Sequence, residues 1–130
     1  MSRTAQNVLI LFLVALFLTG CSIATKSVLA PNDEVLNYEL PYDLTYLRVL
    51  DALNDETDWQ VEQTDKEKGM IVARNVNYSR LNDADRRVIA FMVKRVDADN
   101  TSVYIEKDSQ RIIGGKQLLQ KINEVLSREL

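Results

Sequence analysis

The sequence predicts an α+β fold: an antiparallel sheet with two helices packed on one face, in the order β-α-β-β-β-β-α. Several short segments alternate apolar and polar residues with the period of two that is typical of a strand. Two longer segments instead repeat apolar residues at helical spacing. Short polar turns separate most of the strands, and such turns favour antiparallel neighbours. We expect a single domain over residues 35–130.

The domain is expected to begin with a strand over residues 35–40, in which Leu36, Tyr38 and Leu40 alternate with polar residues. A helix over 43–56 should follow, with Asp43 as its N-cap. Its apolar face is predicted from the spacing of Leu44, Tyr46, Leu47, Val49, Leu50 and Leu53.

Four further strands and a second helix complete the predicted domain. Trp59 and Val61 share one face of a strand over 59–64, and we expect that face to be in the core. Three more strands are predicted over 70–76, 86–96 and 101–107. Turns should lie at 65–69, which ends in glycine, and at Asp97–Asn100, and a polar loop should cover 77–85. Gly114 and Gly115 are expected to turn the chain into a helix over 115–129, whose apolar stripe is Leu118, Leu119, Ile122, Val125 and Leu126.

The first 20 residues have the layout of a secretory signal peptide. Arg3 precedes an apolar run of eleven residues, Val8 to Leu18, and small residues then lead to Cys21, the only cysteine. The run is shorter than the roughly 20 apolar residues that a membrane-spanning helix needs. Residues 1–20 are therefore predicted to be a leader, and residues 21–34 a tether in front of the domain.

Leu18-Thr19-Gly20-Cys21 resembles the lipobox of bacterial lipoproteins. The resemblance implies cleavage between Gly20 and Cys21, attachment of a diacylglyceryl group to the Cys21 thiol, and a membrane anchor of more than one acyl chain. Ser22 then favours the outer membrane, with the domain facing the periplasm. A cleaved but unlipidated signal peptide and an uncleaved N-terminal anchor remain alternatives.

The rest of the chain resembles small bacterial lipoproteins of unknown function and the helix-grip domains of BamC, an accessory lipoprotein of the outer-membrane β-barrel assembly machine. The similar segments are Tyr38–Asp43 before the first helix, Trp59–Glu62, and Asp65–Ala73, within a region of about residues 36–129. Asp58 departs from the glycine that usually precedes the tryptophan. BamC also has two such domains and a long N-terminal segment, whereas one domain is predicted here. The resemblance implies a fold but supplies no catalytic residues.

No catalytic or metal-binding constellation stands out in the sequence. The chain has no histidine, which excludes Ser-His and Cys-His arrangements. The acidic groups Asp55, Glu56 and Asp58, and Asp83 with Asp85, are interpreted as solvated charges rather than acid–base pairs. Asp97-x-Asp99-Asn100 lacks the glycine and distal glutamate of a calcium loop, and an anion site at Gly114-Gly115 with Arg111 and Lys116 is the less favoured interpretation. We expect no enzyme activity, cofactor, metal or nucleic-acid partner.

One predicted face of the sheet is unusually apolar. Strand alternation directs Ile71, Ala73, Ile89, Phe91, Val93, Val103 and Ile105 toward the helices. The opposite face then receives Met70, Val72, Val88, Ala90, Met92 and Tyr104, with Arg74, Arg87, Lys94 and Glu106 around it. A solvated face would alternate to polar residues, so these six predict an interface. Cover by residues 22–40, or an unremarkable surface, remain alternatives.

These observations favour a lipid-anchored periplasmic envelope protein that acts as a non-catalytic interaction or assembly-accessory module. Its partner would be an envelope protein or a second copy of the chain. The alternative is a periplasmic carrier that binds a lipid or another apolar ligand between the helices and the sheet.

Overall fold

The computed structural model describes residues 30–77 and 87–128, and all structural statements below concern these residues. Within them the elements are β1 (Val35–Tyr38), α2 (Tyr42–Asn54), β2 (Trp59–Asp65), β3 (Met70–Asn75), β4 (Val88–Arg95), β5 (Thr101–Ile105), the short 3-10 helix η2 (Lys107–Ser109) and α3 (Gly115–Ser127). The predicted leader, Cys21 and most of the 77–85 loop lie outside the described residues.

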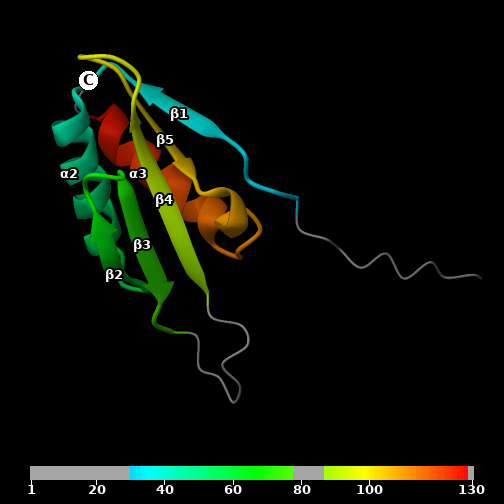
Figure 1. The fold of residues 1–130 in the computed structure, drawn as a ribbon. Coiled ribbons are helices and arrows are strands. Elements are labelled where there is room, and N and C mark those ends of the chain that lie inside the picture. Colours follow the sequence, from blue (N-terminus) through cyan, green and yellow to red (C-terminus); the bar gives the residue numbers. More distant parts are fainter. Residues whose placement is uncertain (1–29, 78–86, 129–130) are drawn as a thin grey trace, which may run out of the picture.

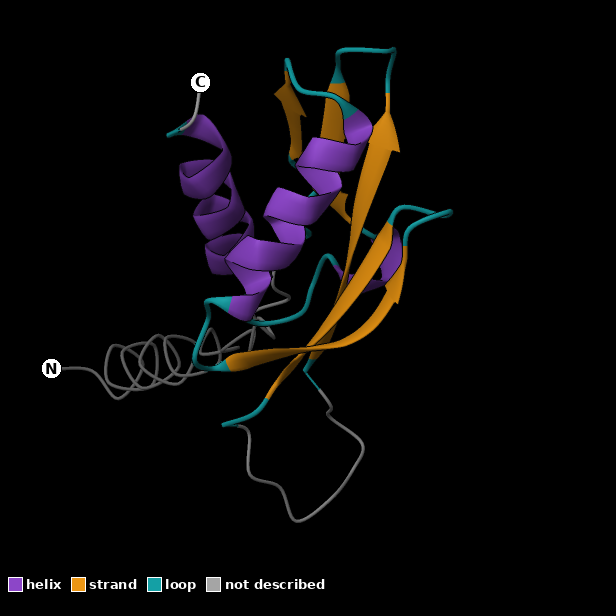
Figure 2. Cartoon of the chain, turned by 90° about the vertical axis from the view of Figure 1, so that its left-hand side faces the viewer, coloured by secondary structure: helices purple, strands orange, loops and turns teal. Residues whose placement is uncertain are grey.

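The five strands form one antiparallel sheet in the order β1-β5-β4-β3-β2. Hairpins join β2 to β3 and β4 to β5, while β1 pairs with β5, the last strand of the chain. Both helices lie on the same side of the sheet (Figures 1 and 2). The predicted α+β class, element order and placement of the helices are therefore confirmed. β1 and β5 each end two residues earlier than predicted, and Lys107–Ser109 form η2 after β5.

The core lies between the sheet and the two helices. All seven side chains that were predicted to face the helices are at most 2% exposed, and Phe91 on the central strand β4 is fully buried. From α3, the predicted stripe contributes Leu118, Leu119, Ile122 and Leu126, while Val125 is partly buried against the core. Period-two and helical spacing were sufficient to identify these positions because each of these elements has a single buried side.

The apolar face of α2 was predicted only in part. Leu44 and Leu47 are 38% and 52% exposed, whereas Thr45 and Ala52 are buried. Residues three apart are rotated by about 60° from the same direction around a helix, so the leucines at 44, 47, 50 and 53 cannot all share one narrow stripe. Tyr46, Val49 and Leu53 complete the buried side of α2. The Thr45 hydroxyl is satisfied because it donates to the Pro41 carbonyl at 3.0 Å.

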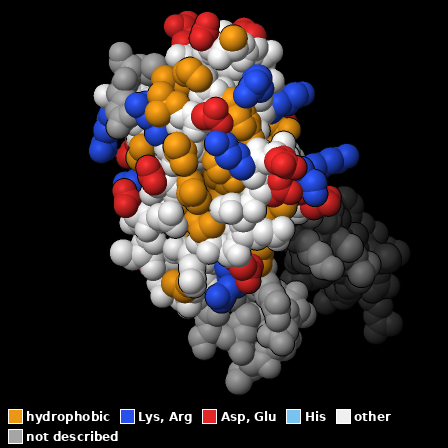
Figure 3. Space-filling model, turned by 60° about the vertical axis from the view of Figure 1, so that its left-hand side comes forward, with side chains coloured by type: hydrophobic (Ala, Val, Ile, Leu, Met, Phe, Trp, Pro, Cys, Tyr) orange, Lys and Arg blue, Asp and Glu red, His pale blue; other side chains and the backbone are white. Residues whose placement is uncertain are grey.

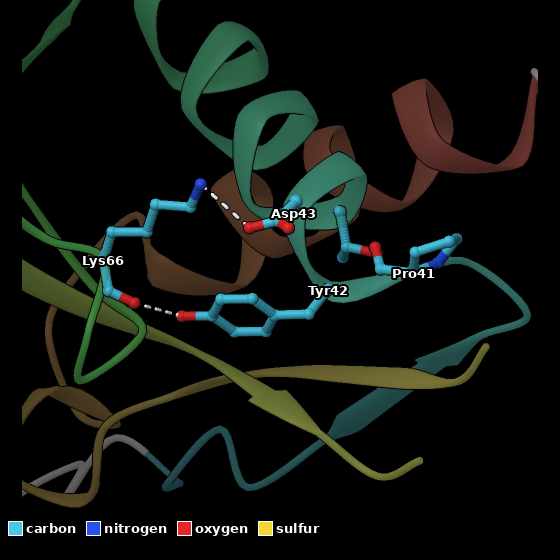
Figure 4. Close-up of polar contacts among 5 residues, drawn as sticks. Pro41, Tyr42, Asp43 and Lys66 are labelled. Carbon is cyan, nitrogen blue, oxygen red and sulfur yellow. Dashed lines mark hydrogen bonds and ion pairs between the residues drawn. The ribbon is translucent and has the colours of Figure 1, made fainter. Parts of the chain in front are cut away.

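Asp43 is not the N-cap of α2, contrary to the prediction. The N-cap is Pro41, whose carbonyl accepts the Thr45 amide, and Asp43 lies in the first turn. Its carboxylate instead contacts Lys66 Nζ at 2.8 Å, and the Tyr42 hydroxyl donates to the Lys66 carbonyl (Figure 4). The hydrogen bond from Lys66 holds the pKa of Asp43 below its usual value. These contacts attach the start of α2 to the turn between β2 and β3.

The N-terminal part of β2 has the predicted orientation, and a bulge changes the rest. Trp59 is buried and Val61 is partly buried against the core. The pairing with β3 shifts between Val61 and Gln63, so one extra residue enters β2 and the alternation restarts beyond it. Trp59 also packs against Gly114, where an added Cβ would lie 2.8 Å from the Trp59 ring, and Gly114 has a φ of 95°. The glycine pair thus turns the chain into α3, as predicted.

The predicted turn at Asp97–Asn100 is confirmed. The Val96 amide donates to the Asn100 carbonyl at 2.9 Å, which closes the hairpin between β4 and β5. The Asp97 carboxylate accepts hydrogen bonds from the Asn100 side chain and the Asp99 amide, and these bonds lower its pKa. This acidic group is therefore occupied in forming the turn.

The contact between Tyr38 and α3 predicts a pH dependence of stability. The Tyr38 hydroxyl donates to Asn123 Oδ1 at 2.9 Å, and burial, followed by the charge of Glu34, raises its pKa to about 12. Because the folded state holds this proton more tightly than the unfolded state, the contribution is complete below about pH 10 and is lost as pH rises toward 12. In urea titrations, wild type should lose more stability over this range than Tyr38→Phe. Parallel pH profiles of the two proteins would contradict the prediction.

Candidate functional site

The candidate site is a row of side chains on the sheet face that lies opposite the helices. Strand register places Val35, Tyr104, Met92, Met70 and Asp65 as successive partners across all five strands. Four of these five residues are apolar or aromatic. The apolar row therefore runs from one edge strand, β1, to β3 and ends at an acidic residue on β2, the other edge strand.

A second row of the same face lies beside the first. Ala90 on β4 pairs with Val72 on β3, and Val88 pairs with Arg74 one step farther along. The structure thus brings together all six residues that were predicted as an interface, and each of them is half-buried. We refer to Val35 and these six residues together as the open sheet face.

Val35 belongs to the open sheet face but was not among the predicted interface residues. Its side chain is 50% exposed, and it lies beside Tyr104. Strand alternation places Val35 on the side of β1 opposite Leu36, so the face to which Val35 belongs was predictable. No local pattern indicates that β1 pairs with β5, because that pairing joins distant parts of the chain.

Charged residues lie around the open sheet face, and two pairs of them neutralise each other. Arg74 Nε lies 3.5 Å from Glu62 Oε1, and Lys68 Nζ lies 3.4 Å from Asp65 Oδ2. No ion pair among the described residues involves Lys94, which is exposed on β4 two residues after Met92. The face is therefore apolar in the middle and charged at its margin.

A second apolar area lies on α2, where Leu44 and Leu47 are exposed. Figure 3, which views the side of the molecule that carries α2 and β2, shows hydrophobic side chains gathered among lysine, arginine, aspartate and glutamate. This area depends on two residues of one helix, whereas the open sheet face crosses four strands. The sheet face is therefore the stronger candidate.

The basic residues near Gly114 lie together, but they share their surroundings with an acid. Arg111, Gly114 and Lys116 line a surface pocket of about 430 Å³, and Glu34 and Pro31 lie in the same lining. The Glu34 carboxylate offsets part of the positive charge. The turn into α3 already explains the conformation of Gly114. That conformation is therefore no separate evidence that the pocket binds an anion.

Of the acidic residues that could form acid–base pairs, the structure describes Asp55, Glu56 and Asp58. Asp58 accepts a hydrogen bond from the Asn77 side chain beside the end of β3, and Asp55 follows α2 as its C-cap. Within residues 30–77 and 87–128, no group of three or more acidic or cysteine side chains could hold a metal ion. Asp83 and Asp85 lie outside the described residues.

The region between helices and sheet, where a carrier would hold its ligand, is occupied by side chains. Phe91, Ile122 and Leu53 are at most 1% exposed there. On the described residues, surface pockets lie beside Gly114 and, with a volume of about 270 Å³, near Tyr42 and Arg95. No observation on the described residues favours the carrier alternative.

Comparison with known proteins gives no matching family model and no matching curated protein. The similarity to BamC domains therefore stays a prediction from the sequence. Among the described residues, no helix is both long and apolar enough to cross a membrane. Gly20 and Cys21, the predicted cleavage and lipidation residues, lie outside that part of the chain.

Proposed function

We propose that this chain is a lipid-anchored periplasmic protein that acts as a non-catalytic interaction module, held at the outer membrane through Cys21. The observation that carries the proposal is the open sheet face. A row of apolar side chains across four strands is retained on the side that the helices do not cover. Side chains on such a face gain stability from burial, and contiguous exposed apolar surface is characteristic of interfaces.

The leader supports the location part of the proposal. Leu18–Cys21 follows an apolar run at the position that a lipobox occupies. Eight residues, 22–29, lie between Cys21 and Ala30, where the described chain begins. Even when fully extended, a segment of that length reaches only about 30 Å. The domain would therefore work next to its membrane and contact partners that are also there.

One experiment tests the anchor and the interface together. A photo-crosslinking residue is placed at Met92, on the open sheet face, or at Gln120, an exposed position on α3, in wild type and in Cys21→Ser. We expect wild type in the membrane fraction, with adducts from position 92 and not from position 120. Cys21→Ser should move to the soluble fraction because it cannot be lipidated, and its folding should be unchanged.

The two parts of the proposal fail separately. Cys21→Ser that stays in the membrane fraction would refute the lipid anchor. Adducts of equal yield from positions 92 and 120 would refute the open sheet face as the interface. Loss of the adduct in Cys21→Ser alone would show that the partner is reached only at the membrane.

A further inference from the structure

We propose that the open sheet face binds a second copy of the same chain, so that two sheets pack face to face around a two-fold axis parallel to the Val35–Met70 row. This inference rests on the proposed function and names its partner. Face-to-face packing of two sheets at about 10 Å is a common way to bury an apolar sheet face. Two observations select this partner and this axis: the arrangement of charge, and the edge at which the chain enters the sheet.

The charge arrangement makes the open sheet face complementary to itself. Lys94 follows Met92 by two residues on β4, and Glu106 follows Tyr104 by two residues at the end of β5. Because β4 and β5 are antiparallel, these two charges lie on opposite sides of the row, each about 7 Å from it. No ion pair among the described residues uses either of them. Arg74 and Glu62, and likewise Lys68 and Asp65, lie beside the face and are paired within one chain.

The row divides the open sheet face into two halves. A two-fold axis along the row packs each half against the other half of the second copy. Lys94 of each copy then lies near Glu106 of the other, and this contact occurs twice. Each residue of the row from Val35 to Met70 meets its own counterpart, so apolar side chains stack on apolar side chains. Asp65, at the end of the row, is paired with Lys68 of its own chain. An axis parallel to the strands and along β4 would instead place Lys94 over Lys94, and two like charges facing each other disfavour association.

The start of the described chain selects the same axis. Ala30 and the residues that follow it lead into β1, the edge strand at one end of the row (Figure 1). A rotation about the row keeps β1 at the same edge in both copies. Both tethers therefore leave the dimer on one side, where they can reach a single membrane. A rotation about an axis parallel to the strands would put the two tethers at opposite edges.

The test uses the full lipidated chain with one added cysteine at Met92, Tyr104 or Met70, and a thiol cross-linker shorter than two strand spacings, about 9.6 Å. Cys21 is blocked by lipid in this form, and wild type shows whether it reacts. We expect each of the three variants to form a covalent dimer with its own copy, and Gln120→Cys to form none. If Tyr104→Cys and Met70→Cys react only when mixed with each other, the proposed axis is wrong.

Charge exchange provides a second test on residues outside the core. In detergent micelles, Lys94→Glu and Glu106→Lys should each raise the dimer dissociation constant about tenfold, since like charges then face each other at two places. The double variant should restore it. The Glu106 carboxylate also accepts a hydrogen bond from the Asp108 amide at 2.9 Å. A loss caused only by that bond would not be rescued by Lys94→Glu.

The outcomes separate this proposal from the proposed function. Adducts with a different protein and none with a second copy would overturn the dimer while supporting the interaction module. Absence of any adduct in folded variants would overturn both. A self-adduct in a protein that fractionates as soluble would support the dimer and refute the lipid anchor.

Discussion

Replacing Gly69 by alanine is expected to lower the free energy of unfolding by about 3 kcal/mol. Gly69 has a φ of 72°, a conformation that residues with a Cβ rarely adopt. An added Cβ would also lie 2.0 Å from the Val93 carbonyl oxygen, which is backbone of the neighbouring strand and cannot rotate away. The Gly69 carbonyl accepts the Val93 amide at 2.7 Å, so moving the turn would also break that bond.

The measurement is the urea midpoint of purified Gly69→Ala against wild type, with Lys68→Ala as the matched control in the same turn. The Lys68 side chain is exposed and contributes an ion pair with Asp65 at 3.4 Å, so its loss should cost less than about 1 kcal/mol. Similar midpoints for the two variants would contradict the close approach of Gly69 to β4. The Tyr42 hydroxyl lies 3.1 Å from the same added Cβ, so Gly69→Ala should also disturb the contact between α2 and this turn.

Local patterns in the sequence were enough to predict the elements and the buried side of most of them. Period two in β4 assigns Phe91 and Met92 to opposite faces whatever the strand's neighbours are, and the structure agrees. The α2 helix shows where such reasoning stops. Its leucines carry the stronger hydrophobic signal, yet Thr45 and Ala52 are buried while Leu44 and Leu47 are exposed. Tertiary packing sets which side of the helix is buried, and no local pattern contains that information.

The candidate site was predictable to a similar extent and for a similar reason. Alternation identified which side chains share a face, but not which strands are neighbours. The pairing of β1 with β5 is a contact between distant parts of the chain, and it adds Val35 to the site. Asp43 shows a different limit of local patterns. Aspartate is a favourable N-cap, but the Asp43 carboxylate pairs with Lys66, which lies in the turn after β2. In both cases, a long-range contact decided between locally acceptable options.

Phe91→Ala is expected to cost about 4 kcal/mol and its neighbour Met92→Ala only about 1 kcal/mol. Phe91 is fully buried between β4 and the helices, so its truncation leaves a cavity that the surrounding side chains can fill only in part. Met92 is half-buried on the other face, beside Tyr104 and Met70, and its removal mainly exposes their sides. Urea denaturation of the two variants at one protein concentration measures both values.

The concentration dependence of the Met92→Ala value connects stability with the proposed interface. If two copies bind through the open sheet face, folding and association are linked, so wild type gains stability as its concentration rises. Met92→Ala should lose most of that gain, so the free energy of unfolding that it costs should grow with protein concentration. The free energy that Phe91→Ala costs should already be near its full value at low concentration. A Met92→Ala cost close to that of Phe91→Ala in dilute protein would mean that both faces of β4 are covered within one chain. That result would remove the structural reason for placing a partner on the open sheet face.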